Sequence, residues 1–243
     1  PAAPAITKAS RGGEDLPLSF AQQRLWFLNQ LVPDSPVYNI PQALRIQGPL
    51  DVDRLQHSIS TLVDRHESLR TTFDSDSGEA RQVIASDGDC KLTRIDLSGL
   101  DEWQTELERL IQQEAGTPFD IQEGPLVRGT VVKCAADEHV LMLTMHHIIS
   151  DGWSMGILLK ELTALYDAAG DPSALPPLPI QYADYAVWQR DWMTAAALER
   201  QCAYWREQLA PRSSLSGSSP FPPASSTRGL PRNSRSNRAT QQC

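Results

Sequence analysis

Two adjacent histidines, followed closely by an aspartate and a glycine, are the residues of this sequence best suited to acid–base chemistry. They are His146, His147, Asp151 and Gly152, and an apolar run over 140–145 precedes them. Side chains alternate along a strand, so the two imidazoles are expected to point to opposite faces. One of them would face a cavity as a base, beside helix N–H groups that favour a developing negative charge. This arrangement suits acyl transfer, although on spacing alone a pair of buried structural histidines is the simpler interpretation.

Two other kinds of site fit the same segment less well. A metal ion needs converging ligands, and His147 with Asp151 would supply only two, so no metal is expected. The spacing of Gly152, Ser154 and Gly156 matches the nucleophile elbow of serine hydrolases, which lies between a strand and a helix. That enzyme class places its histidine after the serine and the acid, and no histidine follows position 147.

Composition and charge exclude several classes of protein. The 243 residues include 30 acidic and 22 basic side chains, a net charge of −8, which is unlike the basic face of a nucleic-acid binder. No apolar run is long enough to span a membrane, and the N-terminus lacks a secretory signal and an initiator Met. The four cysteines form no C-x-x-C pair, so scattered thiols in a reducing cytoplasm are expected.

Apolar periodicity predicts a fold of alternating helices and strands, hence the α/β or α+β class. Strands are expected at 43–47, 70–73, 81–85, 92–96, 125–134 and 139–147. A short helix or turn is expected at 19–31, and helices are expected at 52–63, 103–111, 153–169, 181–193 and 195–209, with Asp51 as the cap of the helix at 52–63. The histidine pair therefore lies where a strand turns into a helix.

The sequence divides into three segments. Residues 1–17 are rich in Pro, Ala and Gly and are expected to be a linker, and residues 18–209 form the folded part. Residues 210–243 are poor in large apolar side chains, and from 211 onward they contain five arginines and no acid. Such a tail cannot bury enough surface to order itself, so it is either disordered or translated out of frame.

Four blocks in order resemble the motifs of condensation domains of nonribosomal peptide synthetases. The histidine block, HHIISDG at 146–152, looks like the HHxxxDG motif of that family. The other three are SFAQQRLWFL at 19–28, RHESLRTTF at 65–73 and QYADYAVWQR at 181–190. Four ordered matches over this length are highly specific, whereas a lone HHxxxDG would not be.

This resemblance implies an α/β fold similar to chloramphenicol acetyltransferase. The family has two such lobes with a tunnel between them, and all four blocks belong to the first lobe. Residues 18–209 are therefore expected to be the N-terminal lobe, with a C-terminal lobe missing. The chain alone is accordingly expected not to catalyse condensation.

The resemblance also implies roles for individual residues. His147 would hold or deprotonate the attacking amine, and His146 would point away and shape the turn. Asp151 would be structural, pairing with an arginine of the second block, Arg70 in preference to Arg65. Gly152 would leave room for backbone to approach the reacting centre. Trp153 and Ser154 would support the site.

The reaction implied is peptide-bond formation between two thioesters, with an L-configured donor and an L-configured acceptor. Both would be carried on the 4'-phosphopantetheine arms of upstream and downstream carrier proteins, beside an adenylation domain, with no cofactor bound directly. Two alternatives stay open at this point. The chain could dock a carrier protein without catalysis, or it could belong to an ester-forming acyltransferase that uses the same histidine.

Overall fold

The computed structural model describes residues 3–11, 16–75, 79–88 and 90–210. The chain divides into two compact units, residues 1–198 and 199–243. The tail expected over 210–243 lies, from residue 211 onward, outside the described residues.

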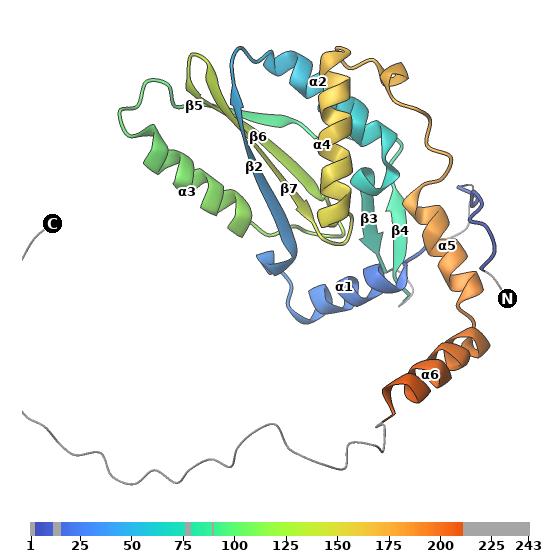
Figure 1. Cartoon of the computed structure of the whole chain (residues 1–243). Helices are drawn as coiled ribbons and strands as arrows, with labels where there is room; N and C mark the ends of the chain where they lie inside the picture. The colour runs from blue at the N-terminus through green and yellow to red at the C-terminus, as the bar shows by residue number, and fades with distance from the viewer. Residues whose placement is uncertain (1–2, 12–15, 76–78, 89, 211–243) are drawn as a thin grey trace, which may run out of the picture. The chain divides into compact units, whose positions relative to one another are not determined.

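A four-stranded mixed sheet, in the order β2–β7–β6–β5, lies in the first unit (Figure 1). Strand β7 (Glu138–His146) pairs antiparallel with β6 (Val127–Ala135) on one side and with β2 (Asn39–Gln47) on the other. Strand β5 (Leu92–Asp96) runs parallel to β6. The strands expected at 92–96, 125–134 and 139–147 are therefore present, and β7 begins and ends one residue earlier than expected.

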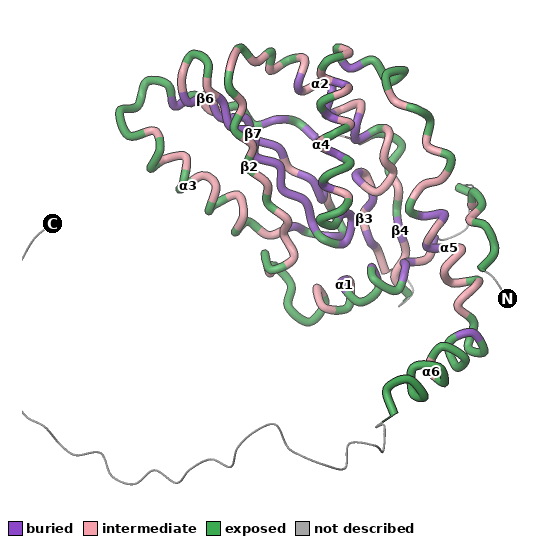
Figure 2. The backbone as a smooth tube through the Cα atoms, in the orientation of Figure 1, coloured by how far each residue is buried: buried purple, intermediate pink, exposed green. Residues whose placement is uncertain are grey.

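Helices cover both faces of β7, which explains why its sequence is a continuous apolar run rather than an alternating one. Leu141, Leu143 and Met145 belong to the core cluster that includes residues of helices α2 (Val52–Arg65) and α4 (Gly152–Asp167). Val140 and Met142 belong to a second cluster, packed against helix α3 (Trp103–Gly116). Figure 2 shows the purple, buried stretch along β6 and β7. Odd and even residues of β7 thus face different layers, as strand geometry requires.

Strand β2 begins four residues before the predicted strand at 43–47. Its register with β7 starts at Asn39 and passes through Pro41, which lies opposite Thr144. Proline cannot donate a ladder hydrogen bond, so it is confined to edge strands, and β2 is the edge of this sheet. The proline therefore marks an edge position here and not the limit of the strand.

A smaller sheet joins distant parts of the chain in the order β1–β4–β3. Strand β4 (Arg81–Ile84) pairs antiparallel with β3 (Thr71–Asp74) and with the short β1 (Leu16–Pro17). Residue 73 of the second block lies in β3, and the Phe73 side chain has no exposed surface. The second block is thereby fixed in the core between helix α2 and this sheet.

The six predicted helices are all present, with ends that differ from the prediction by a few residues. Asp51 caps α2 as expected, because its Oδ1 accepts a 2.9 Å hydrogen bond from the backbone N–H of Arg54. Helix α6 crosses the boundary between the two units. Among the described residues, no helix has both the length and the apolar character needed to cross a bilayer. The helices are α1 (Phe20–Leu31), α2 (Val52–Arg65), α3 (Trp103–Gly116), α4 (Gly152–Asp167), α5 (Tyr182–Trp192) and α6 (Ala195–Leu209).

The N-terminal segment, expected to be a linker, contacts helix α5 in its described part. The indole N–H of Trp188 donates to the carbonyl of Pro4 at 2.8 Å. The backbone N–H of Ala9 donates to Asp184 at 3.0 Å, and Arg11 forms an ion pair with the same carboxylate at 2.8 Å. Residues 3–11 are therefore attached to the fold, while 1–2 and 12–15 lie outside the described residues.

Candidate active site

The histidine turn begins where β7 leaves the sheet. His146 is the last residue of the strand and lies opposite Asn39, and the backbone N–H of His147 still donates to the carbonyl of Tyr38 at 2.8 Å. His147 itself is the first residue of the turn that leads into α4. The prediction that both histidines lie in the strand is therefore wrong by one residue.

His146 is enclosed in the protein. The residue is 1% exposed, and its ring makes edge contacts with the rings of Tyr38 and Phe119, each at a centroid distance of 6.2 Å. Its Nδ1 accepts a 3.1 Å hydrogen bond from the backbone N–H of Ile148, which closes the turn. Burial, with a smaller effect of the neighbouring His147, lowers the pKa of His146 to about 4. This imidazole is neutral at pH 7 and shapes the turn.

The low pKa of His146 predicts that acid destabilises the fold. Above about pH 6.5 the ring is neutral in both the folded and the unfolded chain. Below that pH the imidazole of residue 146 binds a proton in the unfolded chain, whereas in the folded chain it binds one only near pH 4. Between pH 7 and pH 5 we expect the free energy of unfolding to fall by about 2 kcal/mol more in the native chain than in His146→Gln. Urea unfolding at the two pH values measures this difference, and equal losses in both proteins would refute it.

His147 is exposed and lies in the wall of a cavity. Its Nδ1 is 2.9 Å from the backbone carbonyl oxygen of Ser150. A carbonyl oxygen only accepts, so Nδ1 carries the proton, and Nε2 of the neutral ring keeps its lone pair. Nε2 has no hydrogen-bond partner in the part of the chain that the structure describes. The turn thus fixes both the orientation and the tautomer of an imidazole that can accept a proton.

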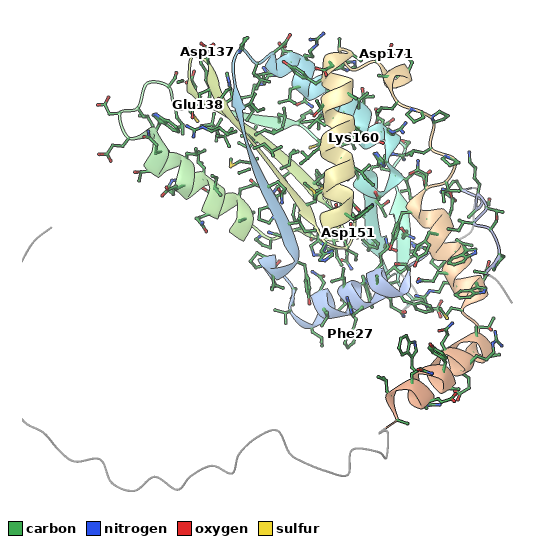
Figure 3. All side chains as sticks on the ribbon, in the orientation of Figure 1. Phe27, Asp137, Glu138, Asp151, Lys160 and Asp171 are labelled. Atoms are coloured by element: carbon green, nitrogen blue, oxygen red, sulfur yellow. The ribbon has the colours of Figure 1, made fainter. Side chains whose placement is uncertain are left out.

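Asp151 caps helix α4, which begins at Gly152 (Figure 3 labels Asp151 at this end of the helix). Its Oδ1 accepts hydrogen bonds from the backbone N–H of Ser154 at 2.8 Å and from the Ser154 hydroxyl at 2.6 Å. These bonds, with a smaller contribution from His147, hold the pKa of Asp151 below its usual range. The carboxylate therefore stays charged at the cavity wall, where Ser154 supports it.

Gly152 and Trp153, the first two residues of α4, both have open surroundings among the described residues. A Cβ at Gly152 would meet no heavy atom within 4 Å, so no part of the described chain approaches this glycine closely. The space in front of Gly152 is open among the described residues, and the role expected for this glycine, to let backbone approach the reacting centre, stays a prediction. Trp153 is 80% exposed, so it contributes little to packing around the turn. The hydroxyl of Ser154 donates to Asp151 and not to a histidine, unlike a hydrolase nucleophile.

The expected ion pair between Asp151 and an arginine of the second block is not formed among the described residues. Arg70 instead donates from Nη1 to the carbonyl of Ala85, at the end of β4. Arg65 donates from Nε to Glu161 of α4 at 3.1 Å and from Nη2 to the carbonyl of Pro176 at 2.6 Å. The physical reason is local competition. Asp151 is satisfied by the first turn of its own helix, and each arginine has a nearer acceptor.

A double-mutant cycle tests this correction. Asp151→Ala removes a helix cap and should cost about 1 kcal/mol of unfolding free energy. Because Arg70 does not bind Asp151, the cost should be the same in the Arg70→Ala background, within about 0.5 kcal/mol. Denaturant unfolding of the four proteins gives the coupling energy. A coupling energy of several kcal/mol would show that Asp151 and Arg70 do form an ion pair.

All four sequence blocks meet at the cavity that contains His147, whose volume is about 420 Å³. The first block contributes Arg24 and Leu25 of α1, and the second contributes His66. The fourth contributes Gln181 and Tyr182, at the start of α5. Predominantly apolar walls with a few polar side chains are typical of small-molecule sites.

Hydrogen bonds between the blocks hold these walls together. Gln181 donates from its side chain to the carbonyl of Arg65 at 2.9 Å and accepts from the backbone N–H of Glu67 at 3.1 Å. The hydroxyls of Ser19 and Tyr182 are 3.0 Å apart, which links the first block to the fourth. Segments that are far apart in the sequence thus position one another around the cavity.

Glu161 and His66 lie at the site but were not predicted from the sequence as functional residues. The carboxylate of Glu161 is 2.6 Å from His66 Nε2, and it also binds Arg65. A signal was present, because Glu161 lies one turn beyond Leu158 and beside Leu162, both buried. An acid on the buried stripe of a helix needs a partner, and the basic second block supplies it.

Comparisons with known proteins agree with this arrangement. A sequence model of the condensation domain matches residues 13–234. Linear gramicidin synthase subunits C and B of Brevibacillus parabrevis are 52% identical over 198 residues and 54% identical over 199 residues. Each match covers 80% of this chain but only 3% and 4% of the respective relative. The chain thus spans a small fraction of the length of these relatives.

Solved structures show the same fold. The X-domain from teicoplanin biosynthesis is 30% identical, with a TM-score of 0.73, and the match covers 86% of this chain and 46% of that one. The starter condensation domain of rhizomide synthetase is 24% identical, with a TM-score of 0.71 over 82% of this chain and 50% of that one. These neighbours confirm the expected α/β fold similar to chloramphenicol acetyltransferase.

Proposed function

Because this chain belongs to the condensation-domain family, we propose that it takes part in peptide-bond formation in nonribosomal peptide synthesis. An amine attacks a thioester, a C–N bond forms, the C–S bond breaks, and the thiol leaves. The observation that carries the proposal is the convergence of four sequence blocks on one cavity. His147 lies in the wall of this cavity, and its Nε2 has no partner among the residues that the structure describes.

In this proposal His147 is the catalytic residue. Its Nε2 accepts a hydrogen bond, and then the proton, from the amine as nitrogen attacks the thioester carbonyl. Asp151 fixes the turn through Ser154, and the unobstructed space in front of Gly152 admits the substrate. The first N–H groups of α4 lie beside the cavity and favour the negative charge that develops on the carbonyl oxygen. His146 serves the same turn as a neutral, buried support.

The substrates proposed are an L-aminoacyl or peptidyl donor and an L-aminoacyl acceptor. Each is a thioester on the 4'-phosphopantetheine arm of a carrier protein, with the two carrier proteins upstream and downstream of this domain. An adenylation domain is the expected neighbour, and the cytoplasm the expected compartment. The similarity to peptide synthetase subunits supports these partners.

A chimera tests the proposal, because the chain covers about half of the solved structures that it matches. Residues 18–209 replace the aligned segment of a gramicidin synthase condensation domain, and loaded carrier proteins supply both thioesters. We expect an amide on the acceptor arm, detected by mass spectrometry. Hydrolysed donor without amide, from a folded chimera whose parent domain is active, would overturn the proposal. The 243-residue chain is assayed beside it, since its sequence predicts no activity for the chain alone.

A protein-binding module is the second candidate. One solved neighbour, 29% identical with a TM-score of 0.76, is a complex of an X-domain with the protein OxyB. The chain would then bind a carrier protein without forming an amide. Equal binding of a loaded carrier protein by the native chain and by His147→Ala, with an inactive chimera, would favour this candidate.

A further inference from the structure

His66 lies in the wall of the cavity, separate from the histidine turn, and its ring is paired with the carboxylate of Glu161 behind it. Nε2 of His66 lies 2.6 Å from Oε2 of Glu161, and the two side chains are only 17% and 14% exposed. An ionised carboxylate only accepts, so Nε2 carries the hydrogen. The acceptor of the neutral ring is then Nδ1, which has no hydrogen-bond partner in the described part of the chain.

Arg65 completes this arrangement and fixes its geometry. Its Nε donates to the same Oε2 of Glu161 at 3.1 Å, and its Nη2 is anchored on the Pro176 carbonyl. The carboxylate of Glu161 is therefore held between the guanidinium of Arg65 and the imidazole of His66. The ring is left oriented by its carboxylate, as in catalytic triads.

Some polar groups of the cavity wall are already engaged. The side-chain oxygen of Gln181 accepts from Glu67, and the Tyr182 hydroxyl is engaged with Ser19. Other polar side chains also line the cavity, among them Arg24, Ser68, His147 and Asp151. His66 differs from His147 in that a carboxylate side chain holds one nitrogen of its ring, whereas a backbone carbonyl holds the ring of His147.

The chemistry of the proposed reaction requires such a group. An acceptor arrives as an ammonium, and its nitrogen loses two protons on becoming an amide. The departing thiolate takes up one proton, and the other must leave the cavity. His147 can accept the proton that the amine loses as it attacks the thioester. The proton that the ammonium loses before the attack therefore needs a second acceptor.

We propose that His66 is a second catalytic residue, which binds the acceptor's ammonium through Nδ1 and takes its first proton, and that Glu161 positions it. The proton then passes to water, while the neutral amine attacks the thioester beside His147. This inference rests on the proposed function for the identity of the reaction. The recognition of an ammonium by His66 is testable without turnover.

The test compares two small probes with the full 243-residue chain. L-Alanine n-propylamide carries the ammonium, and N-acetyl-L-alanine n-propylamide has the same arm without it. NMR titration gives both dissociation constants and reports on the His66 ring directly. We expect the native chain to prefer the ammonium probe, and this probe alone to shift the His66 ring signals.

Substitutions show which residue causes the preference for the ammonium probe over the acetylated probe. His66→Phe should reduce it by about tenfold or more, since a hydrogen bond to a charged group is lost, and should leave binding of the acetylated probe unchanged. Glu161→Gln should reduce it by a smaller factor. His57→Phe, the same change on α2 outside this cavity, is the matched control and should have no effect. Thermal unfolding of each variant confirms that it is folded.

Two outcomes overturn the inference. One is a native chain that binds both probes equally, with no shift of the His66 ring. The other is a preference removed by Asp151→Asn or His147→Gln and kept by His66→Phe. If the chimera is active and either of these results is found, the proposed function stands and only the role of His66 is refuted. If the chimera is inactive but the preference for the ammonium probe depends on His66, only the ammonium-binding site is supported.

Discussion

Replacement of His147 by glutamine should slow amide formation by the chimera by about 10²- to 10⁴-fold, the usual contribution of a general base. The reason is the fixed tautomer. The ring is held by a 2.9 Å bond from Nδ1 to the Ser150 carbonyl, and this leaves Nε2 as the proton acceptor. Glutamine retains the ability to hydrogen-bond but cannot take the proton at neutral pH.

Rapid-quench measurement of a single turnover with both loaded carrier proteins gives this rate directly. His57→Gln, on the exposed side of α2, is the control and should retain the native rate. The free energy of unfolding should change by less than about 1 kcal/mol, since His147 is exposed. A rate of amide formation within threefold of the native rate would show that His147 is not the general base.

Asp184→Ala should lower the free energy of unfolding by about 3–5 kcal/mol, a large share of the stability of a domain. The Asp184 side chain is 2% exposed and forms a 2.8 Å ion pair with Arg11. It also accepts from the backbone N–H groups of Gln181, at 2.7 Å, and Ala9, at 3.0 Å. Burial alone would raise its pKa, but these hydrogen bonds and the charge of Arg11 lower it. The alanine variant leaves two backbone amides without their acceptor, and Arg11 keeps its ion pair with Glu67, at 2.7 Å.

Denaturant unfolding of Asp184→Ala and Arg11→Ala separates these contributions. Arg11 is 31% exposed, so its loss should cost less than the loss of Asp184. A cost below about 1 kcal/mol for Asp184→Ala would show that this carboxylate does not hold the N-terminal segment and α5 together.

The regular elements could be predicted because each depends on a short-range pattern. The apolar spacing of α2 and the cap at Asp51 are both visible in the sequence, and both are confirmed. The predicted separation of the two histidines is also observed, since His146 is buried among aromatic rings and His147, one residue beyond the end of β7, lies in the cavity wall. The edge position of β2 could not be predicted, because the order of strands depends on pairing with β7, a hundred residues later.

The side-chain partners at the site were less predictable, because they depend on which acceptor is nearest in three dimensions. Asp151 was expected to pair with Arg70, yet it binds Ser154 three residues away. Arg65 and His66 converge on Glu161, about a hundred residues later in the chain. Sequence spacing shows that a buried acid needs a partner, but only the packing of α2 against α4 determines which one.

The most direct test of the central claim is the tautomer of His147 in the full chain. Long-range ¹⁵N–¹H correlation spectra distinguish a protonated ring nitrogen from one with a free lone pair. The geometry of the turn predicts that Nδ1 carries the proton and that Nε2 is unprotonated when the ring is neutral. A neutral ring with its proton on Nε2 would contradict this account, because the cavity would then hold a donor where amide formation requires a base.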